Sequence, residues 1–259
     1  MTRFFHELGS MCLFFHRVTQ TLLQTKGNIR PILAQVAFVS YRSLSTVMFA
    51  GVFVGAILVL QLYLILSKYD AQIFLGGLNT STVVREVGPL IISFLLAGKI
   101  GAFTAAELGT MRVTEQIDAI ECLGTNPIQY LIVPRLFGII ISSLILLMIG
   151  LLVSVGGSMF VAWVTCDMNA SEFTSTIPKF ISIWAVLGAM FKAVLYGGIV
   201  ATVSCHRGFS ATGGARGVGR AVTMASTYTN LYILIANFMA SHFLDILGKL
   251  AQGYFGIQL

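Results

Sequence analysis

Residues 136 to 166 read LFGIIISSLILLMIGLLVSVGGSMFVAWVTC, without one charged side chain. A helix of ~20 residues already crosses the ~30 Å hydrocarbon core of a bilayer. Because this run is longer than a perpendicular crossing requires, we expect its helix to tilt or to project from the membrane. The stretch predicts that the chain is an integral membrane protein.

The composition of the whole chain agrees with that prediction. Of the 259 residues, 56% are hydrophobic and only 10% are charged, whereas an ordinary soluble domain is ~25% charged. The formal net charge is +6, but the basic residues are spread thinly rather than gathered in one stripe, which argues against nucleic acid as a partner. The cysteines lie far apart with no C-x-x-C pair, so neither a disulfide framework nor a metal site is indicated.

Five apolar runs predict an all-α membrane protein with five transmembrane helices. The predicted spans are about 45–66, 85–107, 136–166, 180–205 and 221–244, within a transmembrane domain of residues 45–259. Between spans 2 and 3, a charged segment at about 108–124 ends in glycine and proline, and it predicts a short helix outside the membrane. Residues 206–220 are rich in glycine and arginine and predict a loop.

Residues 1–44 precede the first span and have a different pattern. Phe4, Leu8, Met11 and Phe15 recur at steps of four and three, which places them on one helical face. We expect an amphipathic helix in the membrane interface, although amphipathicity alone also fits a helix that packs on other protein. Pro31 then favours the start of a second, short helix.

Lysine and arginine are concentrated in alternate connections between the apolar runs. The positive-inside rule therefore places the N-terminus, the 107–135 connection and the 206–220 segment on the cytoplasmic side. Five spans then place the C-terminus on the opposite side.

Three charged residues lie where charge is costly. Arg85 and Glu86 begin the second span, where ionisable groups either face protein and water or reach back to the headgroups, and the sequence leaves both readings open. Lys192 lies near the middle of the fourth span and should not face lipid. A structural role, bonding to carbonyls or to a carboxylate on another helix, is favoured over contact with substrate.

Two motifs are weak grounds for chemistry. The glycine-rich stretch from Gly208 lacks the G-K-[ST] of a phosphate-binding loop. Ser210 beside His206 lacks the second glycine of a nucleophile elbow, so no catalytic residue is predicted. The charged helix between spans 2 and 3 is either a solvated face or a ridge for a cytoplasmic partner, and its residue types fit both.

Several motifs together resemble the MlaE or YrbE type of ABC permease, which works with MCE-domain proteins in phospholipid trafficking. The resemblance is carried by REVGPL at 85–90, by AGKIGAFTAAELGTMRVTEQIDA at 97–119, by Pro134-Arg135, by SCHRG at 204–208 and by GGARGVGRAVT at 213–223. It covers most of the chain after residue 45. Two departures are Ala221-Val222-Thr223, where the family often has Ala-Thr-Thr, and a tail beyond Leu247 that is longer than expected.

The resemblance implies partners and site residues. It implies a homodimer in a bacterial inner membrane, with a separate cytoplasmic ABC ATPase subunit that uses ATP and Mg²⁺, and an MCE-domain protein on the opposite side; the chain itself would bind no cofactor. The 107–124 segment becomes the coupling helix, with Glu107, Arg112, Glu115 and Asp118 facing the ATPase. The lipid cavity would be lined by Val52, Val59, Leu60 and Tyr63, with Arg85 and Glu86 near the exit towards the MCE partner.

These expectations define a mechanism and two alternatives. Closure of the ATPase subunits would push on the coupling helices and squeeze lipid from an apolar cavity between two copies of the chain. An ion-coupled secondary carrier using Lys192, Arg85 and Glu86 would instead require inverted repeats, which the sequence lacks. A non-transporting membrane scaffold would bind partners without carrying lipid.

Overall fold

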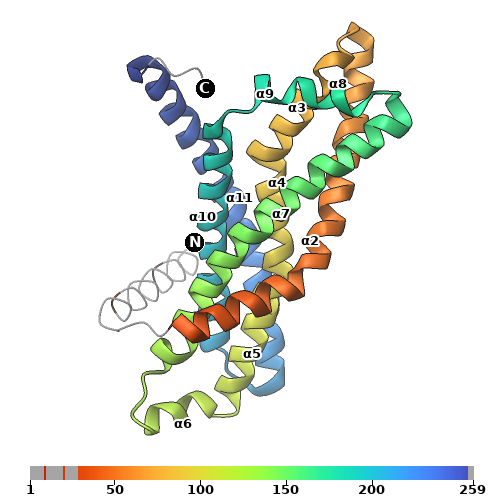
Figure 1. The fold of residues 1–259 in the computed structure, drawn as a ribbon. Coiled ribbons are helices and arrows are strands. Elements are labelled where there is room, and N and C mark those ends of the chain that lie inside the picture. Colours follow the sequence, from red (N-terminus) through yellow and green to blue (C-terminus); the bar gives the residue numbers. More distant parts are fainter. Residues whose placement is uncertain (1–8, 10–19, 21–28, 256–259) are drawn as a thin grey trace. The chain divides into compact units, whose positions relative to one another are not determined.

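The computed structural model describes residues 9, 20 and 29–255, and Figure 1 traces the order of their helices. The amphipathic helix predicted before residue 29 lies outside the described residues. Throughout the described part of the chain, the regular structure is helical. Five helical stretches are long and apolar enough to cross a membrane, as predicted: Ile29–Tyr69, Gln72–Val113, Ile128–Cys166, Ile183–Phe209 and Gly214–Leu250.

The first spanning helix, α2 (Ile29–Leu66), begins much earlier than the predicted span. Pro31 lies in its first turn, where proline needs no helical N–H partner. The proline therefore starts this long helix rather than a separate short one. The hydropathy pattern locates only the part of α2 that crosses the bilayer.

The second spanning stretch is assembled from short pieces. After the short 3₁₀ turns η1 (Ser67–Tyr69) and η2 (Gln72–Phe74) it runs through α3 (Leu75–Thr82), η3 (Val83–Val87), α4 (Gly88–Leu96), η4 (Ala97–Gly101) and α5 (Ala102–Val113). The segments η3 and η4 are single π-helical turns, which are rare in α-helices and common at functional sites. The helical stretch thus begins well before Arg85, where the predicted second span starts.

The charged segment between the second and third spans differs from the single helix predicted at 108–124. It consists of the end of α5 and a separate short helix, α6 (Gln116–Cys122). Glu115 separates the two with a φ of 59°, in the left-handed region. Gly124, with φ of 75°, follows α6 and is the expected glycine stop. Glu107 and Arg112 consequently belong to α5.

The remaining helices follow in order. The π turn η5 (Ile128–Ile132) leads into α7 (Val133–Cys166), and the short helices α8 (Ala170–Ser175) and α9 (Ile177–Phe180) precede α10 (Ile183–Phe209) and α11 (Gly214–Phe255). The glycine-rich segment predicted as a loop at 206–220 is helical apart from Ser210–Gly213. Gly217 lets the first turn of α11 lie close to the carbonyl oxygen of Thr212. A Cβ at this position would collide with that oxygen.

The described chain forms two compact units. The first contains segments 1–43, 96–143 and 195–233, and the second contains 44–95, 144–194 and 234–259. Helices α2, α7, α10 and α11 each contribute residues to both units.

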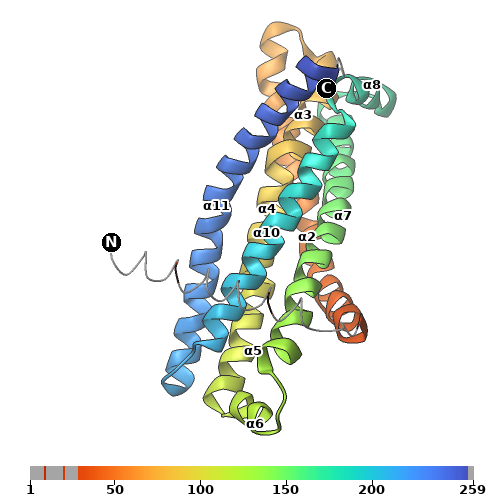
Figure 2. The same cartoon turned by 90° about the vertical axis from the view of Figure 1, so that its left-hand side faces the viewer.

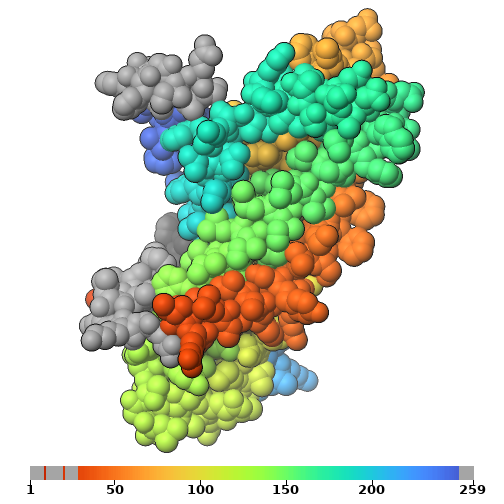
Figure 3. Space-filling model, in the orientation of Figure 1, coloured from red at the N-terminus to blue at the C-terminus, as the bar shows by residue number. Residues whose placement is uncertain are grey.

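In the second unit, small residues let α2 and α7 pack closely. These parts of the two helices lie side by side in Figures 1 and 3. A Cβ on Gly51 would lie 2.9 Å from the carbonyl oxygen of Gly150, and one on Gly157 would lie 2.9 Å from the carbonyl oxygen of Val52. Larger side chains would force these backbones apart, so the small residues explain the contact.

At one end of the same unit, α3 packs on α8 and α9, and Figure 2 shows α3 and α8 together there. Phe173 of α8 is fully buried in a cluster with Val59, Leu75, Ala162 and Met168. The backbone N–H of Gly77 donates to Thr176 Oγ1 at 3.1 Å. The short helices thus cover the ends of α2 and α7 within this unit.

In the first unit, α5 packs closely on the end of α10. A Cβ on Gly208 would lie 2.8 Å from Cβ of Leu108 and 2.9 Å from the carbonyl oxygen of Ala105. Ser142 of α7 donates to the carbonyl oxygen of Val36 in α2 at 3.1 Å. These contacts join α5 to α10 and α2 to α7 within the first unit.

Candidate functional site

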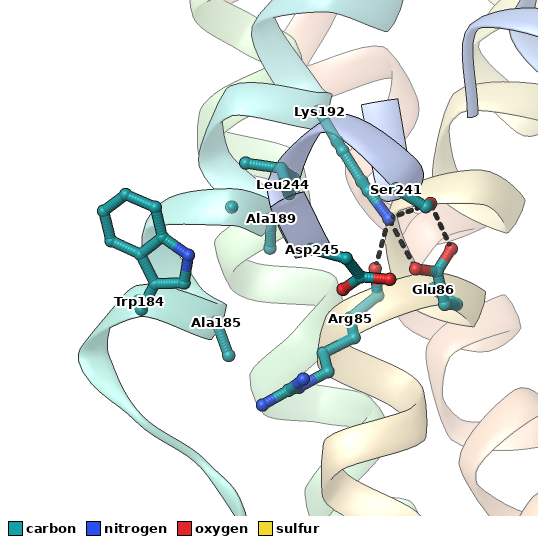
Figure 4. Close-up of a pocket in the computed structure, with 10 residues that line it drawn as sticks. Arg85, Glu86, Trp184, Ala185, Ala189, Lys192, Ser241, Leu244 and Asp245 are labelled. Atoms are coloured by element: carbon teal, nitrogen blue, oxygen red, sulfur yellow. Dashed lines mark hydrogen bonds and ion pairs between the residues drawn. The ribbon is translucent and has the colours of Figure 1, made fainter. Parts of the chain in front are cut away.

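The second unit contains a buried lysine whose three donors are all used. Lys192 is only 2% exposed in α10, and its Nζ donates to the carbonyl oxygen of Arg85 at 2.7 Å, to Glu86 Oε1 at 2.8 Å and to Ser241 Oγ at 2.8 Å (Figure 4). An ammonium group has three N–H donors, so the group is fully satisfied. Its partners, a carbonyl and a carboxylate on other helices, are of the two kinds that the sequence led us to expect.

Glu86 connects this lysine to α11. Its Oε2 lies 2.9 Å from Ser241 Oγ and 3.4 Å from Nδ2 of Asn237. Ser241 also lies 2.8 Å from the carbonyl oxygen of Asn237, and its one hydroxyl hydrogen serves one of these acceptors at a time. The side chain of Glu86 is 46% exposed, so the network has a buried cationic end and a more accessible anionic end.

The π turn η3 places Arg85 and Glu86 for these contacts. The turn is closed by the N–H of Gly88 bonding to the carbonyl oxygen of Val83, five residues back. A π turn is wider than an α turn and disturbs the regular i to i−4 ladder. Lys192 donates to a carbonyl within this disturbed turn, which is the kind of backbone group that needs a partner inside a membrane.

A small pocket of about 50 Å³ lies beside the network. The side chains of Arg85 and Asp245 are exposed at this pocket, and no ion pair joins them in the described part of the chain. The indole Nε1 of Trp184 is buried there without a hydrogen-bond partner among the described residues. The pocket is lined by Arg85, Glu86, Trp184, Ala185, Gly188, Ala189, Lys192, Ser241, Leu244 and Asp245 (Figure 4).

Sequence reasoning missed four polar contributors to this site. Trp184 lies just after the start of α10, while Asn237, Ser241 and Asp245 all lie on α11. The last three recur at steps of four, so they share one helical face. That spacing on one face of the fifth span, ending in a carboxylate, was a signal that could have found them.

The residues predicted to line a lipid cavity differ in exposure. Val52 is 39% exposed and Leu60 is 40% exposed, whereas Tyr63 is partly buried. Val59 has no accessible surface, because it lies in the cluster with Leu75 and Phe173. Val59 therefore offers no surface to a lipid in the single chain, and the lining role of the set stays a prediction.

The predicted coupling residues lie in the first unit. Glu107 pairs with Arg135 at the start of α7 at 2.9 Å, and Arg112 pairs with Asp118 across the break between α5 and α6. The guanidinium of Arg112 also lies 6.0 Å from the ring centre of Phe209, within the range of a cation–π contact. Glu115 is exposed at the break itself. Arg112 and Asp118 thus join α5 to α6, whereas Glu107 and Arg135 join α5 to α7.

A family model described as Permease MlaE matches residues 32–243, which include both ion-pair regions. The chain belongs to the MlaE permease family. A probable ABC transporter permease protein of Rickettsia conorii is 34% identical over 92% of both chains, and one of Synechocystis is 33% identical over 93% of this chain and 92% of its own. The chloroplastic protein trigalactosyldiacylglycerol 1 of Arabidopsis thaliana is 30% identical over 88% of this chain and 65% of its own.

This MlaE-family permease is therefore a multi-pass membrane subunit of the ABC transporter type. The family match includes Arg85, Glu86 and Lys192, and it ends two residues before Asp245. The pocket beside the lysine network consequently combines residues inside the matched region with two just beyond it, Leu244 and Asp245.

Proposed function

We propose that this permease belongs to an ABC transporter that moves phospholipid, or a similar hydrophobic lipid, between membranes. Two copies of the chain form the membrane channel, a separate ATPase subunit binds on the cytoplasmic side, and an MCE-domain protein binds on the opposite side. The membrane is a bacterial inner membrane, and the N-terminus is cytoplasmic. The chain uses no cofactor itself, since ATP and Mg²⁺ are bound by the ATPase.

The observation that carries the lipid cargo is the apolar exposed face of α2. Phe49 and Phe53 are 70% and 63% exposed, and Val52 and Leu60 lie on the same helix with about two-fifths of their surface accessible. Among the five spanning helices, α2 and α11 bury the smallest shares of their residues within the single chain. Burial of an acyl tail contributes ~0.8 kcal/mol per CH₂, so such a face can hold lipid without an elaborate polar pocket.

The name of the Arabidopsis relative refers to a glycerolipid, and it supports a lipid cargo. The Rickettsia and Synechocystis relatives, named as ABC transporter permeases, support an ATPase partner. We assign that partner to α6 and the end of α5, where Glu115 is exposed and Leu123 is 83% exposed. The Arg112–Asp118 pair then transmits movement of the ATPase from α6 to α5, and the Glu107–Arg135 pair transmits it from α5 to α7.

In this scheme the lysine network keeps η3, α10 and α11 together in the second unit. Lys192 acts as a structural charge whose bonds prevent an unpaired cation in the membrane. Arg85 and Glu86 lie towards the exit for lipid, and Arg85 is free of ion pairs in the described structure, so its guanidinium is available to a phosphate.

The experiment that tests this function is mass spectrometry of the gently solubilised protein with everything that copurifies. We expect a lipid-bearing complex that contains two copies of the chain, an ATPase subunit and an MCE-domain protein. Reconstitution of that complex should then transfer a fluorescent phospholipid between vesicles only when ATP is added. A lone chain without an ATPase would overturn the proposal and favour a secondary carrier, and a stable complex that never carries lipid would favour a scaffold.

A further inference from the structure

An apolar groove adjoins the charged pocket in the second unit. It has a volume of about 250 Å³ and lies between the start of α10 and the far part of α11. Its walls include Leu187, Phe191, Phe243 and Leu247, and it shares Trp184 and Leu244 with the charged pocket. An apolar cavity of ~150 Å³ already binds benzene, so the groove is large enough for part of an acyl chain.

The charged pocket has one available cation and one available anion. Lys192 and Glu86 neutralise each other at 2.8 Å. Arg85 and Asp245 are both exposed, and in the described part of the chain neither forms an ion pair. Figure 4 shows Trp184 across the pocket from these two residues. A ligand that satisfies both charges must itself carry a negative and a positive group.

Trp184 contributes to the walls of both cavities. Its Nε1 is buried and makes no hydrogen bond with the described residues, although buried indole N–H groups usually find an acceptor. The indole lies where the charged pocket and the apolar groove meet.

We propose that this combined site selects a zwitterionic glycerophospholipid. Arg85 binds the phosphate, Asp245 binds a headgroup ammonium, and one acyl chain occupies the groove beside Trp184. The inference rests on the proposed function and deepens it by naming the headgroup class. Asp245 lies two residues beyond the end of the family match.

The test uses the full chain with its copurifying subunits in nanodiscs that contain equal amounts of dioleoyl phosphatidylethanolamine and dioleoyl phosphatidylglycerol. The ratio of the two lipids retained by the protein is measured by native mass spectrometry. We expect an enrichment of phosphatidylethanolamine of about two- to fivefold, the range that one exposed ion pair supports. Asp245→Asn should return the ratio to that of the nanodisc, and Asp245→Lys should invert it.

The matched control is Asp70→Asn, which removes an exposed carboxylate from the same unit but outside the pocket. It should keep the wild-type ratio. An equal ratio in the wild type, or an enrichment that survives in Asp245→Asn, would show ordinary annular lipid only and would overturn the inference. Because binding is measured without ATP, this outcome is distinct from failure of the proposed function, which would appear as absence of ATP-dependent lipid transfer.

A second variant fills the place where the groove and the charged pocket meet, because Gly188 lines both. A Cβ on Gly188 would lie 3.2 Å from Cδ1 of Leu244, so Gly188→Leu places its side chain in the groove. We expect the amount of retained lipid to fall at least twofold, while the thermal unfolding temperature stays close to that of the control Gly198→Leu. At Gly198, on the same helix, a Cβ would meet only Cδ1 of Ile140 at 4.0 Å. Unchanged lipid retention in a folded Gly188→Leu protein would exclude the groove as the acyl site.

Discussion

Lys192 and Arg112 both pair with a carboxylate, but the two ion pairs lie in different surroundings. Lys192 is 2% exposed and makes three bonds to other helices. Arg112 is 37% exposed and its partner Asp118 is 49% exposed, across a short break between two helices. A buried charge that loses its partner is strongly destabilising, whereas an exposed pair contributes little. The Lys192 ion pair therefore stabilises the second unit. The Arg112 ion pair contributes little to stability and remains available to another protein.

The largest loss of stability is expected when Glu86, the more exposed partner of the buried ion pair, is replaced. Glu86→Gln leaves the ammonium of Lys192 buried without a counter-charge, and we expect a loss of ~3 kcal/mol in unfolding free energy. Lys192→Met leaves a carboxylate whose side chain is 46% exposed, and water can solvate it, so the loss should be smaller, ~1–2 kcal/mol. Unfolding in detergent micelles measures both values.

The double variant Glu86→Gln with Lys192→Met is the control for this order. It removes both charges, and we expect it to recover most of the stability lost in Glu86→Gln, because apolar replacements of buried ion pairs are often neutral. A double variant as unstable as Glu86→Gln would contradict the view that the unpaired charge is the cause.

Substitutions at the close helix contact in the second unit should have the next largest effect on stability. They test helix packing separately from the ion pair. Gly157→Ala places a Cβ 2.9 Å from the carbonyl oxygen of Val52, so we expect a loss of ~1–3 kcal/mol from forced separation of the helices. The adjacent Gly156 has no atom within 4 Å of such a Cβ. Gly156→Ala should be neutral or should stabilise by up to ~1 kcal/mol, because alanine is the better helix former. Equal losses in the two variants would show that close approach is not the cause.

A substitution at the break before α6 should raise the unfolding free energy rather than lower it. Glu115 has a φ of 59°, which costs a non-glycine residue ~1–2 kcal/mol. Glu115→Gly should therefore stabilise the isolated chain by up to ~1 kcal/mol, yet lower the lipid-stimulated ATP hydrolysis of the complex if the carboxylate meets the ATPase. Gln116→Gly, inside α6, should instead destabilise the chain. A Glu115→Gly complex with normal ATP hydrolysis would remove this residue from the coupling surface.

The smallest effect on stability is expected at the exposed pair. Arg112→Gln and Asp118→Asn should each change the unfolding free energy by less than ~1 kcal/mol. If the pair serves the ATPase contact, ATP hydrolysis in the reconstituted complex should fall nonetheless. A stability loss as large as that of Glu86→Gln would end the contrast between the two regions.

The five spans were predictable because hydrocarbon imposes a length and a composition on each crossing helix. Helix ends beyond the bilayer were not, since no such constraint acts there. The helix α2 extends back to Ile29, and α11 begins at Gly214 within a segment whose glycines predicted a loop. The break at Glu115 was also hidden, because an ordinary glutamate adopts the left-handed conformation there.

At the site, the sequence predicted the kind of partner that Lys192 needs but not its identity. Glu86 and Ser241 lie 106 and 49 residues from it along the chain, and only tertiary packing brings them together. Arg85 and Glu86 were visible because charge is rare near hydrocarbon. Trp184 was hidden, because a tryptophan near the end of a span is ordinary in membrane proteins.

The π turns of the second spanning stretch also affect how this protein tolerates changes in length. A π turn contains one residue more than the α turn it replaces, and each residue of a helix advances the facing direction by about 100°. Removal of one residue from Val83–Val87 would therefore restore an ordinary helix and rotate every later side chain of α4 relative to Arg85. The extra residue changes the direction in which all later side chains point. Arg85 and Gly88 can therefore contact different neighbours although they lie on one continuous helical stretch.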